Sequence, residues 1–552
     1  MAADGVPPGS QPHPDTPATG DVSRRGFLRG AGAVGLGAAA TGPLAAGQAL
    51  TAGPAAAATG TAGRDRPPRA GYHWLAGDHH VHSQFSVDGM YRVRDLVRQA
   101  RAYGLDWLVL ADHGRDVHAS AGAQLAAADI AAVRRAVGDM LVFQGLEWNI
   151  PAAEHGTVFV HPGPDDLAVL REFESRFDAD VLDATGTAAP DEELALAGLR
   201  FLGEAVDRRR VRDALFIGNH PARRGLNTPH ELRRWRDTRP DVAIGFEGAP
   251  GHQAAGIAAP FGLGMARGLY YLSATDESFA GYPRESYRTW GGFDWMAATV
   301  GGVWDSLLAE GRPWWITASS DAHSIYADPA VTGPDSDFHG TGRHADPVYG
   351  GAINPWTFDF WPGYYSRTHV GADRRSYAAV MAGLRAGRIW VDHGGLIDSL
   401  DVRAVADRRW ATLGGTLTVR SGSRVELTIS VDLAQEANWA QFVPRLARVD
   451  VIRGAVTGPV ADLDTRTAPQ TSVVESFEVT ATTGTVTFRY DLGHVTEPCY
   501  LRVRGTDGNR SAPGYLGAAV DPAGPAMDLE GSADPWTDLW FYSNPIWVRP
   551  GR

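Results

Sequence analysis

The chain has 552 residues, of which 44% are hydrophobic and 21% are charged, a composition typical of a soluble globular protein with more than one core. Its formal net charge of -13 argues against broad, sequence-independent binding of nucleic acid, although a local basic pocket is compatible with it. Cys499 is the only cysteine, which excludes an intramolecular disulfide and a thiolate metal cluster. Any metal must therefore be held by nitrogen and oxygen atoms.

Residues 1–62 are predicted to be an export signal and linker. The stretch Ser23-Arg24-Arg25-Gly26-Phe27-Leu28-Arg29 resembles the twin-arginine export motif, and an Ala- and Gly-rich, mildly apolar segment follows it. A membrane-anchoring helix is the alternative, but so many glycines disfavour a stable spanning helix. We therefore expect a secreted or extracytoplasmic protein, exported by the twin-arginine route, with no stable membrane insertion after signal cleavage.

Residues 70–399 are predicted to form an α/β domain. Short, mostly apolar runs over residues 107–111, 141–145, 215–218 and 314–318 have the length of buried strands. Amphipathic stretches with helical spacing lie between them, over residues 93–103, 125–137, 194–207 and 377–386. This alternation indicates a parallel sheet or a barrel.

Residues 400–552 are predicted to form an antiparallel β-sandwich. Alternating apolar and polar residues mark half-buried strands over residues 416–420, 424–431, 448–452, 485–490 and 500–504. The strongly apolar segment 539–547 is expected to be a last strand that docks the two domains or lines the edge of a pocket. No cluster of metal-ligating residues stands out in this part of the sequence.

The first candidate ligands follow directly after the start of the α/β domain. His80 and His82 are two residues apart on an extended segment, so their imidazoles point to the same face and can hold one ion. Asp88 follows in a turn that can fold it back over the same place. The alternative reading is a pair of histidines with ordinary polar partners and a simple turn aspartate.

Two further motifs end apolar runs. Asp112 and His113 follow the run 107–111, so one can face a site while the other orients a ligand, unless Asp112 only caps a helix. Glu147 lies near the end of the next run, and a carboxylate there can bridge two cations or form a surface salt bridge.

The remaining motifs lie farther along the chain. His220 precedes a proline that fixes the turn after the run 215–218, and Asp321 and His323 repeat the two-residue spacing after the run 314–318. His155 and His161 flank an apolar stretch with the length of a strand. They would lie at opposite ends of that strand, so we expect only one of them to be a ligand.

Over residues 73–395 these motifs resemble, in the same order, those of the PHP (polymerase and histidinol phosphatase) family of metal-dependent phosphoesterases. The resemblance implies a distorted (β/α)7 barrel whose mouth holds two or three divalent ions, with Zn, Mn or Fe as candidates. It also implies nine ligands: His80, His82, Asp88, His113, Glu147, His155, His220, Asp321 and His323. His161 is the alternative to His155.

The implied reaction is hydrolysis of a phosphomonoester or phosphodiester by a water molecule that the cations activate. Asp112 or Asp321 would orient that water, and Arg223 and Arg224 would contact phosphate unless they are ordinary surface arginines. A small phosphorylated substrate is expected, with nucleic acid as the alternative. Two other functions are hydrolysis of a non-phosphate bond and metal binding without catalysis.

Two insertions relative to compact members of the family occupy residues 251–311 and 325–376 and are rich in aromatic residues and glycine. Loops of this length shape a pocket or a lid, or they pack against the sandwich. The four histidines within them are predicted to be structural: His252, His339, His344 and His369.

Overall fold

The computed structural model describes residues 72–183, 189–508 and 534–551. The predicted export signal lies outside these residues. No helix among them is long and apolar enough to cross a membrane.

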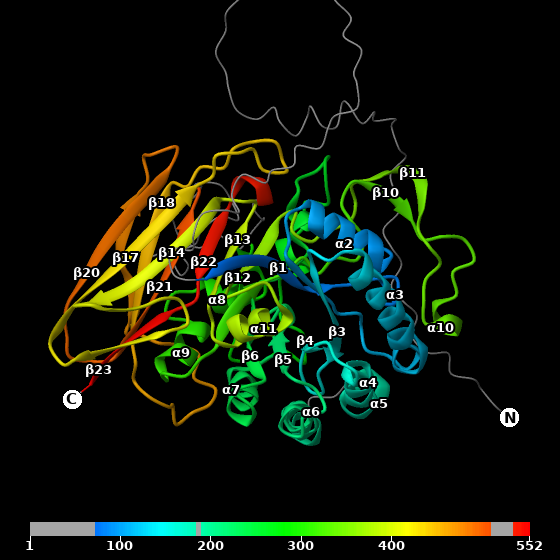
Figure 1. Cartoon of the computed structure of the whole chain (residues 1–552), viewed down its shortest axis with the longest axis horizontal. Helices are drawn as coiled ribbons and strands as arrows, with labels where there is room; N and C mark the ends of the chain where they lie inside the picture. Colours follow the sequence, from blue (N-terminus) through cyan, green and yellow to red (C-terminus); the bar gives the residue numbers. More distant parts are fainter. Residues whose placement is uncertain (1–71, 184–188, 509–533, 552) are drawn as a thin grey trace, which may run out of the picture. The chain divides into compact units, whose positions relative to one another are not determined.

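Seven strands of one large sheet follow one another in chain order (Figure 1). They are β1 (His73–Val81), β2 (Trp107–Leu110), β3 (Leu141–Asn149), β4 (His155–Val160), β5 (Ala214–Gly218), β6 (Ala243–Ala249) and β9 (Trp315–Ala318). All neighbouring pairs are parallel except those made by β4, which runs antiparallel to both β3 and β5. The amino end of β4 therefore lies beside the carboxyl ends of its neighbours.

The first of these strands is bridged to the segment that follows the last one. Among the described residues, Val81 and Ala322 form an isolated parallel bridge, whereas the first half of β1 pairs antiparallel with β12 (Ser366–Ala372). The Thr368 side chain joins β12 to β9, since its Oγ1 accepts from Ala318 N at 2.8 Å and donates to Ala318 O at 2.7 Å. The α/β class with a large sheet is confirmed, while a regularly closed (β/α)7 barrel stays a prediction.

Helices connect these strands, and the four expected from amphipathic spacing are present. They are α2 (Val93–Ala102), α3 (Ala123–Ala136), α6 (Ala189–Asp207) and α11 (Tyr377–Arg385), joined by α4 (Asp166–Phe177), α5 (Ala179–Leu182) and α7 (Pro229–Thr238). In α2 the buried Val93, Leu96, Val97 and Ala100 recur at helical spacing. Thr228 and Glu231 form a capping box at the start of α7.

The two insertions are mostly short elements. Residues 251–311 contain η2 (Gln253–Gly256), η3 (Arg267–Leu269), η4 (Arg284–Ser286), β7 (Thr289–Trp290), β8 (Phe293–Asp294), α8 (Trp295–Ala298) and α9 (Val303–Ala309). Residues 325–376 contain β10 (Asp328–Val331), α10 (Phe338–Thr341), β11 (Val348–Asn354) and β12. The first insertion packs against the C-terminal strands, where Phe293 stacks on Tyr542 with ring centroids 3.8 Å apart.

The C-terminal part contains two sheets. One is four-stranded, with β14 (Ile397–Ala406), β15 (Arg409–Ala411), β17 (Ser423–Leu433) and β20 (Thr485–Val495). The other continues the large sheet through β16 (Thr416–Arg420), β18 (Arg448–Ala455), β19 (Thr471–Glu478), β21 (Cys499–Thr506), β22 (Trp540–Ser543) and β23 (Ile546–Gly551). The short helix η5 (Pro535–Thr537) precedes β22.

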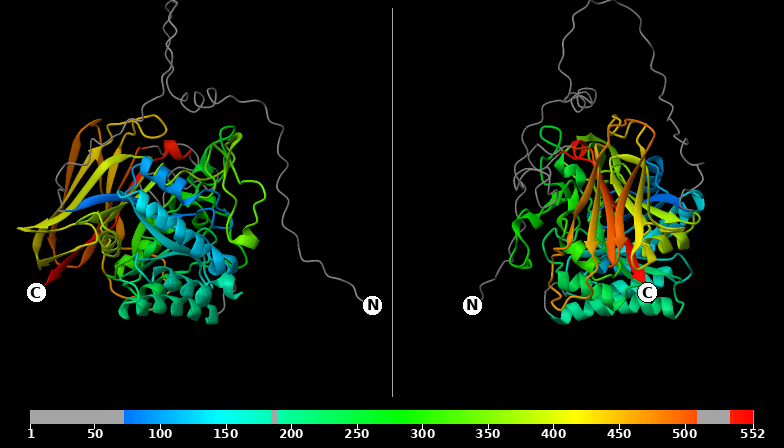
Figure 2. Two further views of the ribbon diagram at one scale, coloured as in Figure 1. Left: turned by 45° about the vertical axis from the view of Figure 1, so that its right-hand side comes forward. Right: turned by 90° about the vertical axis from the view of Figure 1, so that its left-hand side faces the viewer.

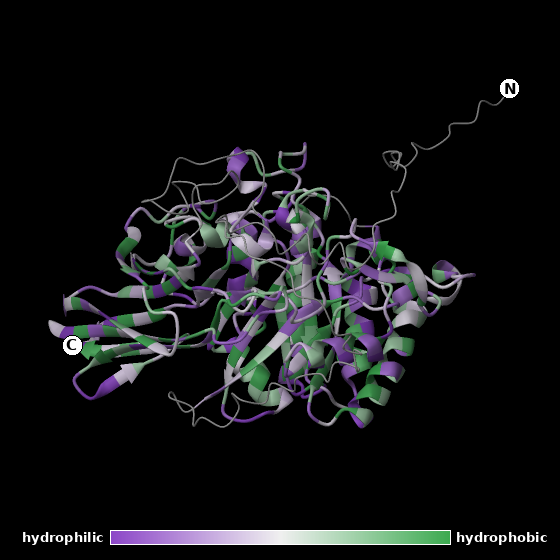
Figure 3. Ribbon diagram, turned by 90° about the horizontal axis from the view of Figure 1, so that it is seen from above, coloured by the Kyte–Doolittle hydropathy of each residue, from purple (hydrophilic) through white to green (hydrophobic). Residues whose placement is uncertain are grey.

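These two sheets share one hydrophobic core, as expected of a sandwich. Every second residue of β17 is buried, from Val425 to Leu433, and this face packs with Val451 and Leu501 of the other sheet. Figure 2 shows the two layers, and Figure 3 shows hydrophilic and hydrophobic residues alternating along the strands.

The sandwich is hydrogen-bonded to the α/β part. Strand β13 (Ile389–His393) pairs with β12 on one side and with β22 on the other, so one sheet runs through both parts. The segment 539–547 thus contributes the strand that docks them. The expected boundary between residues 399 and 400 stays a prediction, because the hydrogen bonds do not stop there.

A buried ion pair reinforces this connection. Asp305 in α9 accepts hydrogen bonds from Arg502 in β21, from Nε to Oδ1 at 2.9 Å and from Nη2 to Oδ2 at 2.7 Å. Tyr500 donates its hydroxyl to the same carboxylate at 3.0 Å, and Trp304 lies under the guanidinium group. Both charged groups are fully buried, so each depends on the other.

We expect Asp305→Asn to lower the free energy of unfolding by about 3–5 kcal/mol, because it leaves the Arg502 charge buried without its partner. Denaturant unfolding of the purified protein measures this. Asp491→Asn is the matched control, since Asp491 pairs with Arg424 on the exposed surface and should unfold like the wild type. Equal losses in the two variants would contradict the prediction.

Candidate metal centre

Four side chains converge where β1, β3 and β9 end. Nε2 of His80 lies 3.0 Å from Nε2 of His82, 3.0 Å from Oε1 of Glu147 and 3.1 Å from Oδ1 of Asp321. Nε2 of His82 lies 3.1 Å from Oε2 of Glu147 and 3.2 Å from the same Asp321 oxygen. All four are buried.

Glu147 is shared by five histidines. Besides His80 and His82, its carboxylate lies 3.2 Å from Nδ1 of His113, 3.2 Å from Nδ1 of His155 and 3.3 Å from Nε2 of His220. Burial alone would raise the pKa of the Glu147 carboxyl, but the imidazoles, His80 above all, hold this pKa well below its usual range. Glu147 thus has the place of a carboxylate that joins two ion sites.

A third group lies at the edge of the cluster. Asp88 faces Nε2 of His113 at 3.3 Å and Nε2 of His323 at 3.4 Å, and the His323 ring stacks on His82 with centroids 3.8 Å apart. The Asp88 side chain is 47% exposed and that of His155 is 25% exposed. These are the two most exposed of the nine expected ligands, so the cluster is most open to solvent beside them.

The direction of β4 decides between His155 and His161. Because β4 is antiparallel to β3 and β5, its first residue, His155, pairs with Asn149 at the end of β3. His161 lies past the other end of β4, where its Nδ1 is 2.8 Å from the Pro162 carbonyl oxygen. The structure therefore brings together all nine expected ligands with His155 among them, and leaves His161 outside.

The donor set suits metal ions. Two nitrogen ligands of a tetrahedral zinc ion lie roughly 3.3 Å apart, given Zn–N bonds of about 2.0 Å, and the His80 and His82 nitrogens are 3.0 Å apart. Oδ1 of Asp321 is buried between two imidazole nitrogens, 3.1 Å from Nε2 of His80 and 3.2 Å from Nε2 of His82. Such a buried, converging set of lone pairs is costly unless cations or protons occupy its centre.

Several residues that hold the ligands in place were not expected from the sequence. Glu247 at the end of β6 lies 2.8 Å from Nδ1 of His80 and accepts a hydrogen bond from the His220 backbone N–H at 2.7 Å. Asn219 donates Nδ2–H to Oε1 of Glu147 at 2.9 Å. Both have a sequence signal, since Glu247 ends an apolar run as Glu147 does, and Asn219 precedes His220 directly.

Asp112, expected to orient water, lies outside the cluster. Its Oδ1 accepts from the Ser83 backbone N–H at 2.6 Å and its Oδ2 accepts from the Ser83 hydroxyl at 2.9 Å. Both oxygens of this buried carboxylate are therefore committed to the chain after His82. Asp112 holds that segment, and Asp321 is the expected water-orienting carboxylate that faces the cluster.

The two candidate phosphate contacts differ in position. Arg223 is 16% exposed, and its Nη2 lies 3.5 Å from Oε2 of the buried Glu154. Burial disfavours its charge, but Glu154 and Asp321 outweigh burial and raise the Arg223 pKa. Arg224 is more exposed, at 34%. Its Nε lies 3.7 Å from Oε1 of the same Glu154, while its Nη2 pairs with Glu277 at 3.1 Å and its guanidinium group lies over the Tyr271 ring.

The histidines of the insertions also differ. His369 stacks on Trp390 and pairs with Asp392, His344 lies 2.8 Å from the Val87 carbonyl oxygen, and His339 is exposed. These positions agree with structural or surface roles. His252 differs from them, since its Nε2 lies 2.8 Å from Oδ2 of Asp321.

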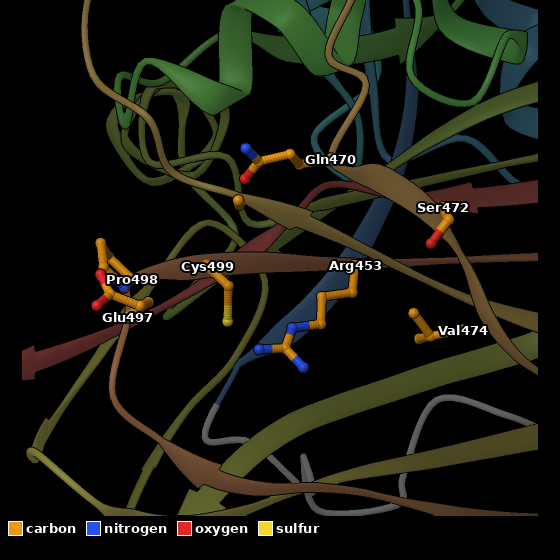
Figure 4. Close-up of a pocket in the computed structure, with 8 residues that line it drawn as sticks. Arg453, Gln470, Ser472, Val474, Glu497, Pro498 and Cys499 are labelled. Carbon is orange, nitrogen blue, oxygen red and sulfur yellow. The ribbon is translucent and has the colours of Figure 1, made fainter.

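The sandwich contributes no comparable cluster among the described residues, where every potential metal group comes from residues 80–323. Its buried Cys499 instead lines a separate small pocket of about 230 Å³ with Arg453, Ser472 and Glu497 (Figure 4). Burial raises the pKa of the Cys499 thiol, which makes it an inert apolar group.

One comparison with known proteins, the match to a family model, agrees with the motifs. Residues 78–162 match the PHP domain family, whereas no curated protein matches the chain. One similar solved structure is a two-domain protein from Bacteroides vulgatus that contains a predicted PHP-like metal-dependent phosphoesterase. It is 14% identical to this chain, the match covers 83% of this chain and 94% of that chain, and the TM-score is 0.30. A candidate metal-dependent phosphoesterase from Bifidobacterium adolescentis has 17% identity, covers 45% of this chain and 87% of its own, and has a TM-score of 0.23.

We expect metal binding to weaken as the pH falls from about 8 to about 6. Burial lowers the His82 pKa, but hydrogen bonds to the Asp321 and Glu147 carboxylates outweigh this and raise the pKa to about 9. Below that pH an incoming cation must displace a proton, so affinity changes about tenfold per pH unit for each proton displaced. Zn²⁺ titration against a competing chelator at several pH values measures this, and a pH-independent affinity would contradict it.

Proposed function

We propose that the protein is an exported, metal-dependent phosphoesterase that hydrolyses a phosphomonoester or phosphodiester. The observation that carries the proposal is the Glu147 carboxylate within reach of five imidazoles, beside Asp321. Nitrogen and carboxylate donors in this mixture suit Zn, Mn or Fe, and their number suits two or three ions.

The bound ions would be held in three overlapping sets. One set is His80, His82, Glu147 and Asp321, a second is Glu147, His155 and His220, and a third is His82, Asp88, His113 and His323. When bound, the cations supply a lowered pKa for water and positive charge for phosphoryl oxygens. No nucleophilic side chain is required.

The protein's own residues contribute position and charge. Glu247 and Asn219 fix the orientations of His80 and Glu147, so the ligands are arranged before a substrate arrives. Arg223 is a half-buried arginine that pairs with Glu154 close to Asp321 and Glu147, and its planar donors match two phosphoryl oxygens. The Asp321 carboxylate faces the same place and orients the attacking water.

The net charge and the sequence support a substrate class and a location for the protein. A net charge of -13 favours a small phosphorylated molecule over a nucleic acid. The twin-arginine stretch supports export. The twin-arginine route carries folded proteins, so it allows metal loading before transport. Hydrolysis of another bond and metal binding without turnover remain the competing functions.

The test is to measure bound metal and hydrolysis of generic phosphate mono- and diesters by the mature protein. We expect at least two ions per chain, loss of hydrolysis after chelation, and recovery when metal is restored. Asp321→Ala/His323→Ala should lose metal and activity, whereas His161→Asn, outside the cluster, should keep both. Equal hydrolysis by wild type and the double variant, or fewer than two ions in the wild type, would sink the proposal.

Arg223→Gln separates substrate binding from metal binding. Loss of one charge-assisted contact to phosphate costs about 1.5–3 kcal/mol, so we expect kcat/KM to fall roughly 10- to 100-fold. The metal content should be unchanged, because Arg223 supplies no metal ligand. Arg224→Gln, at the more exposed of the two arginines, is the matched control and should lower kcat/KM less.

A further inference from the structure

His252 joins the first insertion to the metal centre. It is 6% exposed, and its Nε2 lies 2.8 Å from Oδ2 of Asp321, the oxygen that does not face His80 and His82. Its other nitrogen, Nδ1, lies 2.5 Å from Oδ1 of Asp359. An imidazole thus links a ligand carboxylate to a second buried carboxylate.

Asp359 belongs to the second insertion and also holds the chain around His323. Its Oδ2 accepts hydrogen bonds from the backbone N–H groups of His323 at 2.6 Å and Ser324 at 3.0 Å. One buried carboxylate therefore fixes His252 and the segment that carries two expected ligands. The two insertions meet at this point, next to the cluster.

The backbone is shaped to bring His252 this close. A Cβ atom added at Gly251 would lie 2.2 Å from Cβ of Asp321, so only glycine lets the insertion come this close to Asp321. The His252 N–H donates to the Ser320 carbonyl at 3.3 Å. The approach of this loop to the Ser320–Asp321 backbone is therefore direct.

His252 also shares an uncommon backbone conformation with two expected ligands. Its φ is +54°, and those of His220 and Asp321 are +28° and +48°, in a region that residues other than glycine rarely adopt. Such strain costs about 1–3 kcal/mol per residue and persists where the surroundings impose it, often at functional sites.

We propose that His252 and Asp359 are positioning residues of the metal centre, through which both insertions set the orientation of Asp321. His252 donates from Nε2 to Oδ2 of Asp321 and so turns Oδ1 toward His80 and His82. Asp359 fixes the imidazole ring from the other side. This inference rests on the proposed metal centre but not on hydrolysis. It makes both insertions part of the site.

The test compares Zn²⁺ affinity and stoichiometry in the full-length mature protein. His252→Asn is the main variant, because asparagine tolerates a positive φ and its side chain is too short to bridge Asp321 and Asp359. We expect an affinity about 10- to 100-fold weaker, with the same number of ions at saturation. His252→Gln, which keeps an N–H at a similar reach, should lie between Asn and wild type, and Asp359→Asn should also weaken binding.

His339→Asn is the control, since His339 is an exposed histidine of the second insertion and should bind Zn²⁺ like the wild type. Unchanged affinity in His252→Asn, with metal-free unfolding like the wild type, would overturn the proposal. So would the loss of one ion at saturation with the other affinities unchanged, which would make His252 a ligand. If the wild type binds metal but hydrolyses no phosphoester, the proposed function fails while this inference stands.

Discussion

The structure depends on a single buried carboxylate, Glu147, shared among five imidazoles from four different segments of the chain. A buried carboxylate without partners would cost several kcal/mol. Without that carboxylate, positive charges on five neighbouring imidazoles would repel one another. Each half of this arrangement therefore needs the other. The strand ends, the antiparallel direction of β4 and the turn before Pro221 bring imidazole nitrogen atoms within about 3 Å of the two Glu147 carboxylate oxygens. The same demand explains why Glu247 and Asn219 are buried beside the cluster: they fix the rings and the carboxylate that cannot be free to rotate.

Much of the fold and site was predictable because its signals are local. His80 and His82 share a face by strand geometry alone, and apolar runs of strand length place Glu147, His220 and Asp321 at one edge of a sheet. The choice between His155 and His161 was different. Their separation along a strand excluded one of them as a ligand, but which one is excluded depends on the direction of β4. The six residues of β4 do not reveal whether the strand runs parallel or antiparallel to its neighbours. The closure of the sheet is a similar case, since the pairing of β1 with β12 joins residues almost 300 positions apart.

The residues that sequence reasoning missed or misplaced are those whose role depends on contacts between insertions. His252 and Asp359 lie 107 positions apart and carry no motif, so only the folded chain shows that they share a hydrogen bond beside Asp321. Asp112 is the opposite case. Its position beside His113 suggested a part in the chemistry, but the Ser83 backbone and hydroxyl take up both of its oxygens. Adjacent residues at a strand end point in different directions, and a sequence alone does not tell which neighbour turns inward.

The link between the sandwich and the first insertion has a consequence for how this protein can be divided. Arg267 donates from Nε to the side chain of Gln253, the residue after His252, and from Nη1 to Asp538, just before β22. A fragment that ended at residue 399 would lack Asp538 and would also leave β13 with a bare edge where β22 had paired. The part that carries the candidate metal centre therefore shares a sheet and a buried hydrogen-bond path with the sandwich. Duplication, fusion or truncation at that boundary would disturb the loop that reaches Asp321, so the two parts are expected to be inherited and expressed together.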